Sequence, residues 1–153
     1  MNNPTSAATD NLELLSFRVE DQEYSVDIMS VREIRSWTKA TSIPHAPDYV
    51  RGVINLRGTV LPVVDLALRL GIRSQEPNER SVIIVVDIGG RAVGLRVDAV
   101  SDILSVPSDA LQPPPDLMSE EAADFIRALT IVEGRMIRVL DTRTVLPALE
   151  DVA

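Results

Sequence analysis

The chain has 153 residues, a net charge of −8, a sequence pI near 4.6 and no cysteine, a length that suits one domain or a pair of small packed subdomains. The acidic balance argues against nucleic-acid binding, which needs basic surface to displace counterions from phosphates, and the lack of cysteine removes disulfides and zinc–thiolate sites. The longest apolar run, Val82–Val86, is far below the roughly 20 residues that span a bilayer. Since the polar start also does not resemble a secretory signal, we expect no membrane insertion and a cytoplasmic location.

The N-terminal part of the chain predicts a tail followed by a β-hairpin. Residues 1–12 are rich in Asn, Ser, Thr and Ala and predict a flexible tail. A strand is expected to begin near Leu12 or Leu14, because apolar and polar side chains then alternate as in a half-buried strand, and the chain is expected to return over Tyr24–Ile28. Asp27 can cap a helical turn, after which Glu33–Trp37 is expected to be extended again.

The central segment, Val50–Leu66, predicts a tight hairpin. Two apolar strands flank Arg57-Gly58, and glycine adopts the positive φ of such a turn at little cost. Upstream, Pro47 fits the first position of a one-turn helix that Gly52 would end.

A short helix is expected after this hairpin. Asp65 can cap Leu66–Leu70, and Gly71 can end it as the residue after the C-cap. The region is also locally basic, because Arg51–Arg73 contains four arginines and one acid.

The second half of the chain predicts two more hairpins with an irregular connection between them. Val82–Val86 and Ala92–Val97 flank Gly89-Gly90, and a strand over Met136–Leu140 follows a turn at Glu133–Arg135. Pro107 and the triplet 113–115 cannot occupy a sheet interior. A short helix capped by Ser119 is expected in this connection, with one apolar face formed by Ala122, Phe125, Ile126 and Leu129.

Two sequence patterns occur twice in the chain. Val31–Ile34 recurs as Val100–Ile103, and the strand between Gly58 and Asp65 recurs between Gly134 and Asp141. Two similar halves of short strands predict a mainly β fold, a duplicated small β-barrel. We expect one domain over 13–153 with subdomains at about 13–76 and 77–153. Chance resemblance among strands rich in Val, Ile and Gly is the alternative.

Few residues in the sequence are suited to catalysis. The only histidine, His45, lies in a proline-flanked loop, where a solvated or capping role is expected. Gly89-Gly90 lacks the Lys-Ser/Thr of a phosphate loop, and no spacing of histidine and carboxylates indicates a metal site. The acids that follow strands are expected to cap helical turns rather than to transfer protons: Asp27, Asp65, Asp98 and Asp141. We therefore expect no enzyme, no metal and no cofactor.

Two charged residues fit a binding surface better. Arg57 stands at the hairpin turn, and Glu33 is lodged between Val31 and Ile34. If both lie on one face of the molecule, they can form an ion pair that fixes the geometry of the first half. A solvated turn residue is the alternative for Arg57.

The sequence resembles the CheW-like family of bacterial chemotaxis coupling proteins in three segments: Val31–Arg35, Arg51–Leu66 and Val93–Leu104. The hairpin Asn55-Leu56-Arg57-Gly58, which leads to Pro62 and Asp65, is the most specific part. The same domain occurs in the chemotaxis kinase CheA and in CheV, but a chain of 153 residues leaves no room for a kinase core or a receiver domain. The family implies two five-stranded SH3-like or OB-like barrels that share a core and exchange some strands.

The resemblance also implies a function. Members of this family are non-catalytic adaptors that link the cytoplasmic tips of methyl-accepting chemoreceptors to the regulatory domain of a CheA-type histidine kinase, in arrays at the membrane. By matching positions, the receptor-binding residues are Val31, Glu33 and Arg57, and the kinase-binding residues are Ala40, Thr41, Arg51, Gly52 and Val60. Two alternatives stay open: a paralogous adaptor in a non-flagellar chemosensory system, and an OB-like oligonucleotide binder.

Overall fold

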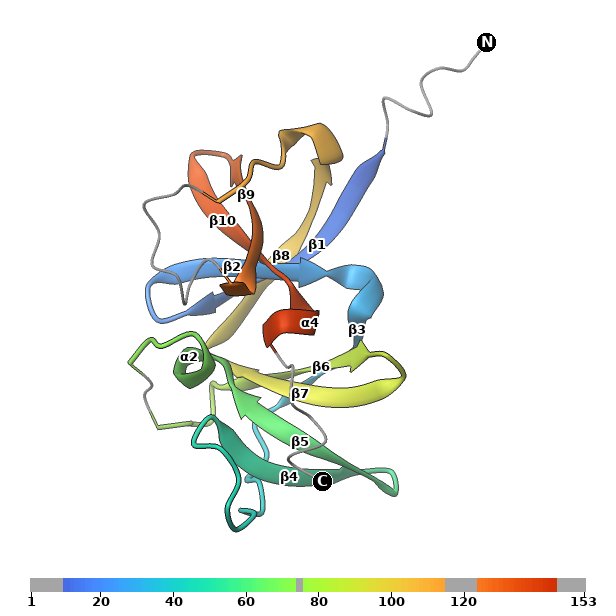
Figure 1. Cartoon of the computed structure of the whole chain (residues 1–153), viewed down its shortest axis with the longest axis vertical. Coiled ribbons are helices and arrows are strands. Elements are labelled where there is room, and N and C mark those ends of the chain that lie inside the picture. The colour runs from blue at the N-terminus through green and yellow to red at the C-terminus, as the bar shows by residue number, and fades with distance from the viewer. Residues whose placement is uncertain (1–9, 74–75, 115–123, 146–153) are drawn as a thin grey trace.

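The computed structural model describes residues 10–73, 76–114 and 124–145, whose strands form two five-stranded sheets (Figure 1). The terminal sheet takes its strands from both ends of the chain: β1 (Asn11–Val19), β2 (Gln22–Asp27), β8 (Ala99–Pro107), β9 (Ile126–Val132) and β10 (Arg135–Leu140). The central sheet takes its strands from the middle of the chain: β3 (Val31–Ser36), β4 (Val50–Leu56), β5 (Thr59–Asp65), β6 (Val82–Ile88) and β7 (Arg91–Val97). The short helices are η1 (Ile28–Ser30), α2 (Leu66–Arg69), η2 (Ser108–Ala110) and α4 (Thr142–Val145).

The two sheets have the same topology, which confirms the duplication. The strand order is β8-β1-β2-β10-β9 in the terminal sheet and β3-β6-β7-β5-β4 in the central sheet. Each sheet contains one parallel pair, β2 with β10 and β5 with β7, and its other pairs are antiparallel. β3 is therefore equivalent to β8, and the β4–β5 hairpin is equivalent to β9–β10, as the two recurring sequence patterns predict.

Sheet membership does not follow the consecutive halves 13–76 and 77–153. β1 and β2 leave the first half and pair with β8 and β10, while β6 and β7 leave the second half and pair with β3 and β5. The exchange of strands that the family resemblance implies thus involves two strands from each half. Each sheet needs residues from both halves of the chain.

Each sheet curls so that its two edges approach. Thr41, in the segment after β3, pairs with Val53 of β4, although β3 and β4 lie at opposite edges of the central sheet. In the terminal sheet Gln112, after β8, pairs with Leu129 of β9 in the same way. These bridges give each sheet the shape of a partly closed barrel.

Three apolar clusters fill the described structure. The largest lies between the sheets and contains residues from both, including Phe17, Tyr24, Leu66 and Leu95. A second cluster fills the curl of the central sheet with Ile54, Leu56, Leu61, Val63, Ile83 and Val85. A third fills the terminal sheet with Leu14, Val106, Ala128 and Val139. Because the largest cluster is shared, neither sheet buries its own apolar residues alone.

Local turn chemistry accounts for most of the predicted hairpins. Arg57 and Gly58 have φ of +52° and +87°, and Glu133 and Gly134 have φ of +52° and +78°. Positive φ at both central residues is the geometry of a tight hairpin turn that matches strand twist. Gly71 ends α2 as predicted: its N–H bonds the Leu68 carbonyl at 3.1 Å.

One helix prediction and the tail boundary were wrong. No one-turn helix runs from Pro47 to Gly52: Pro47 opens a turn closed by a 3.0 Å bond from the Val50 N–H, and Gly52 lies at a bulge inside β4. Asn11 and Leu12, expected in the tail, already pair with β8.

The helix predicted before the last hairpin extends less far than expected: Phe125 is helical, as predicted, but β9 begins at the next residue. Ile126 and Leu129 lie in β9 rather than on a helix face, because pairing with β10 satisfies their backbone groups over the whole strand. Ser119 and Ala122 lie outside the described residues. None of the described helices has the length and apolar character to cross a membrane.

Candidate functional site

Glu33 and Arg57 form an ion pair at the tip of the β4–β5 hairpin, an arrangement that the sequence allowed if both residues lie on one face. Arg57 Nη2 donates to Glu33 Oε1, and the Arg57 side chain is 71% exposed while that of Glu33 is 26% exposed. The turn is fixed by Asn55, whose Oδ1 accepts the Gly58 N–H at 2.9 Å. Arg57 is thus held by its backbone and by its charge, and remains accessible to a partner.

A second arginine contacts the same carboxylate. Arg35 Nη1 lies 3.3 Å from Glu33 Oε2. The hydrogen bond from Arg57 is the largest cause that lowers the pKa of Glu33 below its usual value, and Arg35 adds to it. The same pair raises the pKa of Arg57. Glu33 is therefore ionised at neutral pH, and the pair carries a net positive charge with Arg35 included.

The ion pair joins two strands from opposite edges of the central sheet. Glu33 lies on β3 and Arg57 follows β4, and the curl of the sheet brings them together. Both line a shallow pocket of about 200 Å³, together with Leu56, Thr59 and Leu61. Because Leu56 and Leu61 belong to the apolar filling of the curl, the ion pair sits at one mouth of this partial barrel.

Val31, the third residue of the expected receptor-binding set, lies apart from the ion pair. It is half-buried against the shared core, and a bulge separates its register from that of Glu33. Its neighbour Ser30 lines a different cavity, of about 540 Å³, together with residues of both sheets that include Asp87 of β6 and Leu140 of β10. β3 therefore runs from a cavity between the sheets to the mouth of the central sheet.

The structure brings three of the five expected kinase-binding residues together. Gly52 has φ of +141°, and a Cβ there would lie 2.2 Å from the Thr41 carbonyl oxygen. Thr41 pairs with Val53 through two 2.9 Å backbone bonds, and Ala40 packs against the filling of the central sheet. Gly52 is thus required by the close approach of two backbone segments.

The other two expected kinase-binding residues have different environments. Val60 is 62% exposed at the start of β5, opposite Asn55 in the hairpin. Arg51 points inward: its side chain is 23% exposed, and its Nε and Nη2 lie 2.9 and 2.6 Å from Asp65 Oδ2. Val60 is available for contact, whereas the guanidinium of Arg51 is engaged within the fold.

N-capping explains two of the four acids for which it was predicted. Asp27 accepts the Met29 N–H at 2.9 Å and Asp141 accepts the Arg143 N–H at 3.0 Å. Asp65 makes no side-chain cap bond to α2, and no helix follows Asp98, which lies between β7 and β8. For Asp65 and Asp98 the prediction was wrong, because arginines compete for their carboxylates.

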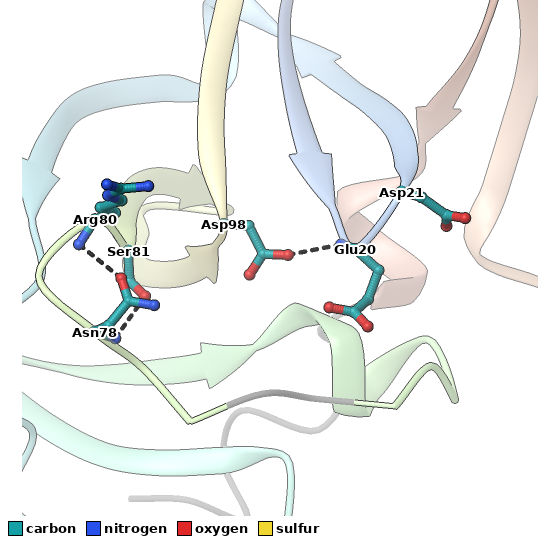
Figure 2. Close-up of a pocket in the computed structure, with 6 residues that line it drawn as sticks. All are labelled: Glu20, Asp21, Asn78, Arg80, Ser81 and Asp98. Atoms are coloured by element: carbon teal, nitrogen blue, oxygen red, sulfur yellow. Dashed lines mark hydrogen bonds between the residues drawn. The ribbon is translucent and has the colours of Figure 1, made fainter.

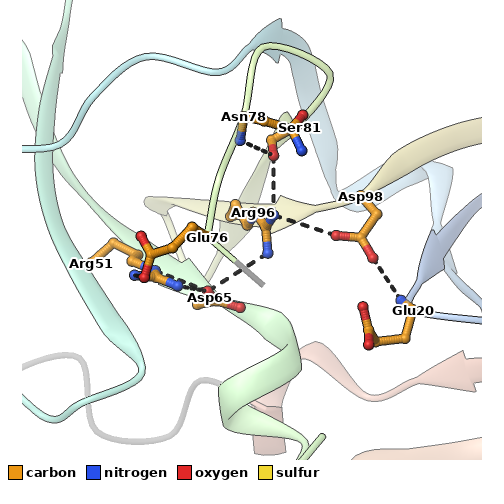
Figure 3. A network of polar contacts seen from close by, with 8 residues as sticks. All are labelled: Glu20, Arg51, Asp65, Glu76, Asn78, Ser81, Arg96 and Asp98. Carbon is orange, nitrogen blue, oxygen red and sulfur yellow. Dashed lines mark hydrogen bonds and ion pairs between the residues drawn. The ribbon is translucent and has the colours of Figure 1, made fainter. Parts of the chain in front are cut away.

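Arg96 lies between the two carboxylates of Asp65 and Asp98 (Figure 3). It is 2% exposed, lies 3.8 Å from Asp65 Oδ2 and 3.4 Å from Asp98 Oδ1, and donates to Ser81 Oγ at 3.1 Å. Asp98 in turn accepts the Glu20 N–H at 2.6 Å. The network connects β5 and β7 of the central sheet to the β1–β2 turn of the terminal sheet.

Arg96 was missed in the sequence, although one signal was available. It interrupts the apolar strand Val93–Val97, and Asp65 ends another apolar strand. Opposite charges inside two apolar strands indicate that the strands are neighbours, since a buried charge needs a partner. In the structure Asp65 and Arg96 face each other in the parallel pair β5·β7.

An acidic pocket of about 550 Å³ lies beside this network (Figure 2). Glu20 and Asp21 come from the β1–β2 turn, Asp98 from the β7–β8 junction, and the rest from the segment before β6: Asn78, Arg80 and Ser81. Its groups bond to one another: the Arg80 N–H donates to Asn78 Oδ1 at 2.7 Å and the Asn78 N–H to Ser81 Oγ at 3.0 Å. These bonds build the fold rather than a reaction site.

The described residues contain no grouping of three or more His, Asp or Glu side chains that could hold a metal ion. His45 is exposed in its loop, with φ of +64°. The polar side chains described above pair with backbone groups and arginines, and none is placed as a nucleophile beside a base. The geometry fits surface recognition.

Comparison with known proteins agrees with this fold. Residues 13–150 match the family described as "CheW-like domain". The chain is 55% identical over 138 residues to the chemotaxis protein CheW of Rhizobium meliloti (strain 1021), covering 90% of this chain and 89% of that protein. It is 52% identical over 129 residues to the probable chemotaxis protein CheW of Rhizobium etli, covering 84% and 83%.

A solved structure gives the same result. The crystal structure of the scaffolding protein TtCheW from Thermoanaerobacter tengcongensis superposes with a TM-score of 0.80 and 31% identity, covering 86% of this chain and 89% of that one. The duplicated five-stranded sheets, the Asn55–Gly58 hairpin and these matches lead to one conclusion: the chain belongs to the CheW-like domain family.

Proposed function

We propose that this protein is a non-catalytic chemotaxis adaptor that couples the cytoplasmic tips of chemoreceptors to a CheA-type histidine kinase in arrays at the membrane. The observation that carries the proposal is the accessible Glu33–Arg57 pair on a CheW-like fold whose close relatives are named chemotaxis proteins. An adaptor needs two separate recognition surfaces and no reactive group, and the chemistry of the described side chains suits that role.

The receptor-facing surface is assigned to β3 and the hairpin tip. Glu33 and Arg57 present a rigid charged pair, and Val31 extends the same strand toward the cavity between the sheets. Arginine suits such a surface, because its planar guanidinium can bind one carboxylate within the fold and still offer donors to a second. We assign Arg57 the direct contact with the receptor tip.

The kinase-facing surface is assigned to the edge where β4 meets the segment after β3. Ala40, Thr41 and Gly52 form its closely packed base, and Val60 supplies an exposed apolar side chain at the hairpin. Arg51 supports this edge from within through Asp65. Specific interfaces bury roughly 1,200–2,000 Å² in total, and weaker ones suffice in an array, where later contacts become effectively intramolecular.

A three-component assay tests the proposal. Receptor tips, a CheA-type kinase and this protein are mixed at micromolar concentration, and co-sedimentation and kinase phosphorylation are measured. We expect kinase stimulation only when all three are present. Failure to bind either partner would refute the adaptor function, and tight salt-sensitive retention of oligonucleotides would favour the nucleic-acid alternative.

Arg57 provides the internal test. Arg57→Ala is expected to weaken receptor co-sedimentation at least about tenfold while its unfolding midpoint stays near that of the wild type, because the side chain is exposed. Arg73→Ala, at another exposed arginine, is the matched control and should bind normally.

A charge reversal at the same pair sharpens the result. Arg57→Glu fits the turn, since Glu133 has the same φ of +52° in the second hairpin. The double variant Glu33→Arg/Arg57→Glu restores the ion pair with reversed polarity, so a direct role predicts that it stays defective in receptor binding. Full recovery of binding would instead make the pair purely structural.

A further inference from the structure

Arg69 connects the two sheets through side-chain contacts. It is the last residue of α2, and its guanidinium carbon lies 4.6 Å from the centre of the Tyr49 ring and 4.9 Å from that of the Phe125 ring. Its Nε donates to the Val145 carbonyl at 2.6 Å, and its Nη2 lies 3.5 Å from the Thr144 carbonyl. Both helices, α2 and α4, lie between the two sheets (Figure 1).

The contacts combine two favourable interactions for an arginine. A guanidinium over an aromatic face is attracted by the ring quadrupole, and here two rings flank the same group. The carbonyls of Thr144 and Val145 belong to the end of α4, where carbonyl groups have no partner within the helix. The planar shape of the guanidinium allows it to stack and to donate at once.

The internal repeat shows that this contact joins equivalent parts of the two halves. Tyr49 precedes the first hairpin by the same spacing as Phe125 precedes the second. The carbonyl of each accepts the N–H of the acid that ends its hairpin: Asp65 at 2.7 Å and Asp141 at 3.0 Å. Val145 is the equivalent of Arg69, and it is buried in the shared core instead of bearing a charge. Arg69 therefore contacts the equivalent aromatic residue of each half, Tyr49 and Phe125.

The chain itself passes between the sheets at two places among the described residues. η1 leads from β2 to β3, and Asp98 separates β7 from β8. Neither passage involves α2 or α4, so Arg69 is a further tie between the sheets. The shared apolar core holds the sheets together, but apolar burial has no preferred direction. The hydrogen bonds of Arg69 and its stacking on two aromatic rings, in contrast, depend on direction.

We propose that Arg69 is a clamp that fixes the orientation of the central sheet relative to the terminal sheet. Each sheet folds without the clamp, and the shared core still joins them. Loss of the clamp widens the range of orientations between them. The clamp is a property of this chain on its own and does not depend on the partners assigned above.

Distance measurement by pulsed electron paramagnetic resonance tests the clamp. The chain has no cysteine, so Asp102→Cys on β8 and Arg91→Cys on β7, both exposed, can carry one spin label on each sheet. In this background Arg69→Met is expected to shift or broaden the distance distribution at unchanged circular dichroism. Arg18→Met, at an exposed arginine of β1, is the matched control and should leave it unchanged.

The distance distributions of the Arg69 variants decide whether Arg69 is a clamp. A folded Arg69→Met protein with the parental distance distribution would overturn the proposal. If Arg69→Met does not fold, Arg69→Lys is measured, because lysine keeps the charge and loses the planar fork. A broadened distribution in Arg69→Lys supports the clamp, and an unchanged one overturns it and assigns Arg69 to folding alone.

Discussion

Glu33 is the carboxylate that binds both arginines of the candidate site, Arg57 at the hairpin turn and Arg35 on its own strand. It accepts hydrogen bonds from Arg57 and from Arg35; the sequence showed it as a charge between apolar residues but left its pairing with Arg57 conditional. Its partial burial, at 26% exposure, is enough to order the carboxylate while leaving it in contact with solvent. Its protonation therefore reports directly on the state of the ion pair.

The pH dependence of this pair has a definite sign. The pKa of Glu33 is lowered from its ordinary value of 4.5, first by the Arg57 hydrogen bond. The pair therefore contributes fully above that ordinary value and is lost as the pH falls through the lowered pKa of the folded state. We expect an NMR titration of the Glu33 carboxyl to have its midpoint below 4.5.

The variant Arg57→Ala tests whether Arg57 lowers the pKa of Glu33. In Arg57→Ala the midpoint should rise toward the ordinary value while remaining under the influence of Arg35. An unchanged midpoint in Arg57→Ala would show that Arg57 does not bond Glu33 in solution.

At the scale of elements, the parallel pairing of β5 with β7 creates the buried charges of the central sheet. It places Asp65, fully buried, beside Arg96, which is 2% exposed, while Arg51 approaches from β4. Arg96 Nε has no hydrogen-bond partner among the described residues. The network is therefore sensitive to which of its members is removed.

Two substitutions should differ in their cost. Asp65→Asn leaves two arginines without their shared carboxylate, and removing one partner of a buried pair typically costs about 3 kcal/mol or more. Arg96→Met keeps the Arg51–Asp65 pair and fills the space with apolar atoms, so a cost of about 1 kcal/mol is expected. Urea unfolding of both variants measures this, and equal costs would contradict the dominant role of Asp65.

The elements also show what the sequence could and could not predict. The hairpins at Arg57-Gly58, Gly89-Gly90 and Glu133-Gly134 follow from turn chemistry, which acts between neighbours in the chain. Asp65 is bound by Arg51 of β4 and also faces Arg96 of β7, a strand far along the chain, and local capping rules, which consider only the residues after Asp65, favoured the wrong partner. The start of β9 was predicted as the end of a helix because Ile126 and Leu129 fit a helical spacing with Phe125, whereas pairing with β10 makes them part of a strand.

For the whole molecule, the repeat could be predicted but the exchange of strands could not be derived from spacing. Residue spacing reveals that two halves are alike, whereas the choice between pairing within a half and pairing across halves depends on packing that no short pattern records. β2 lies between two strands. One is β1, its hairpin partner, and the other is β10 of the second half rather than another strand of the first half. The candidate residues came from the positions that match the CheW-like family, and the structure places their strands β3, β4 and β5 in one sheet.

The exchange predicts that the consecutive halves cannot be separated. Fragments 1–76 and 77–153 each lose partners on both sheets: β3 and β5 lose β6 and β7, and β2 loses β10. We expect neither fragment to show a cooperative urea transition by circular dichroism, whereas the full chain does. A cooperative transition in either isolated fragment would contradict the interdependence of the sheets.

The strand order also has a consequence for synthesis on the ribosome. The central sheet is contiguous and is complete once Val97 has been made, but the β1–β2 hairpin must wait for β8 and β10. At typical translation rates the interval between Asp27 and Leu140 is on the order of ten seconds. During that interval Phe17 and Tyr24 lack the core residues that β9, β10 and α4 contribute, so the β1–β2 hairpin is made before the other described strands but gains its last sheet partner only when β10 is complete.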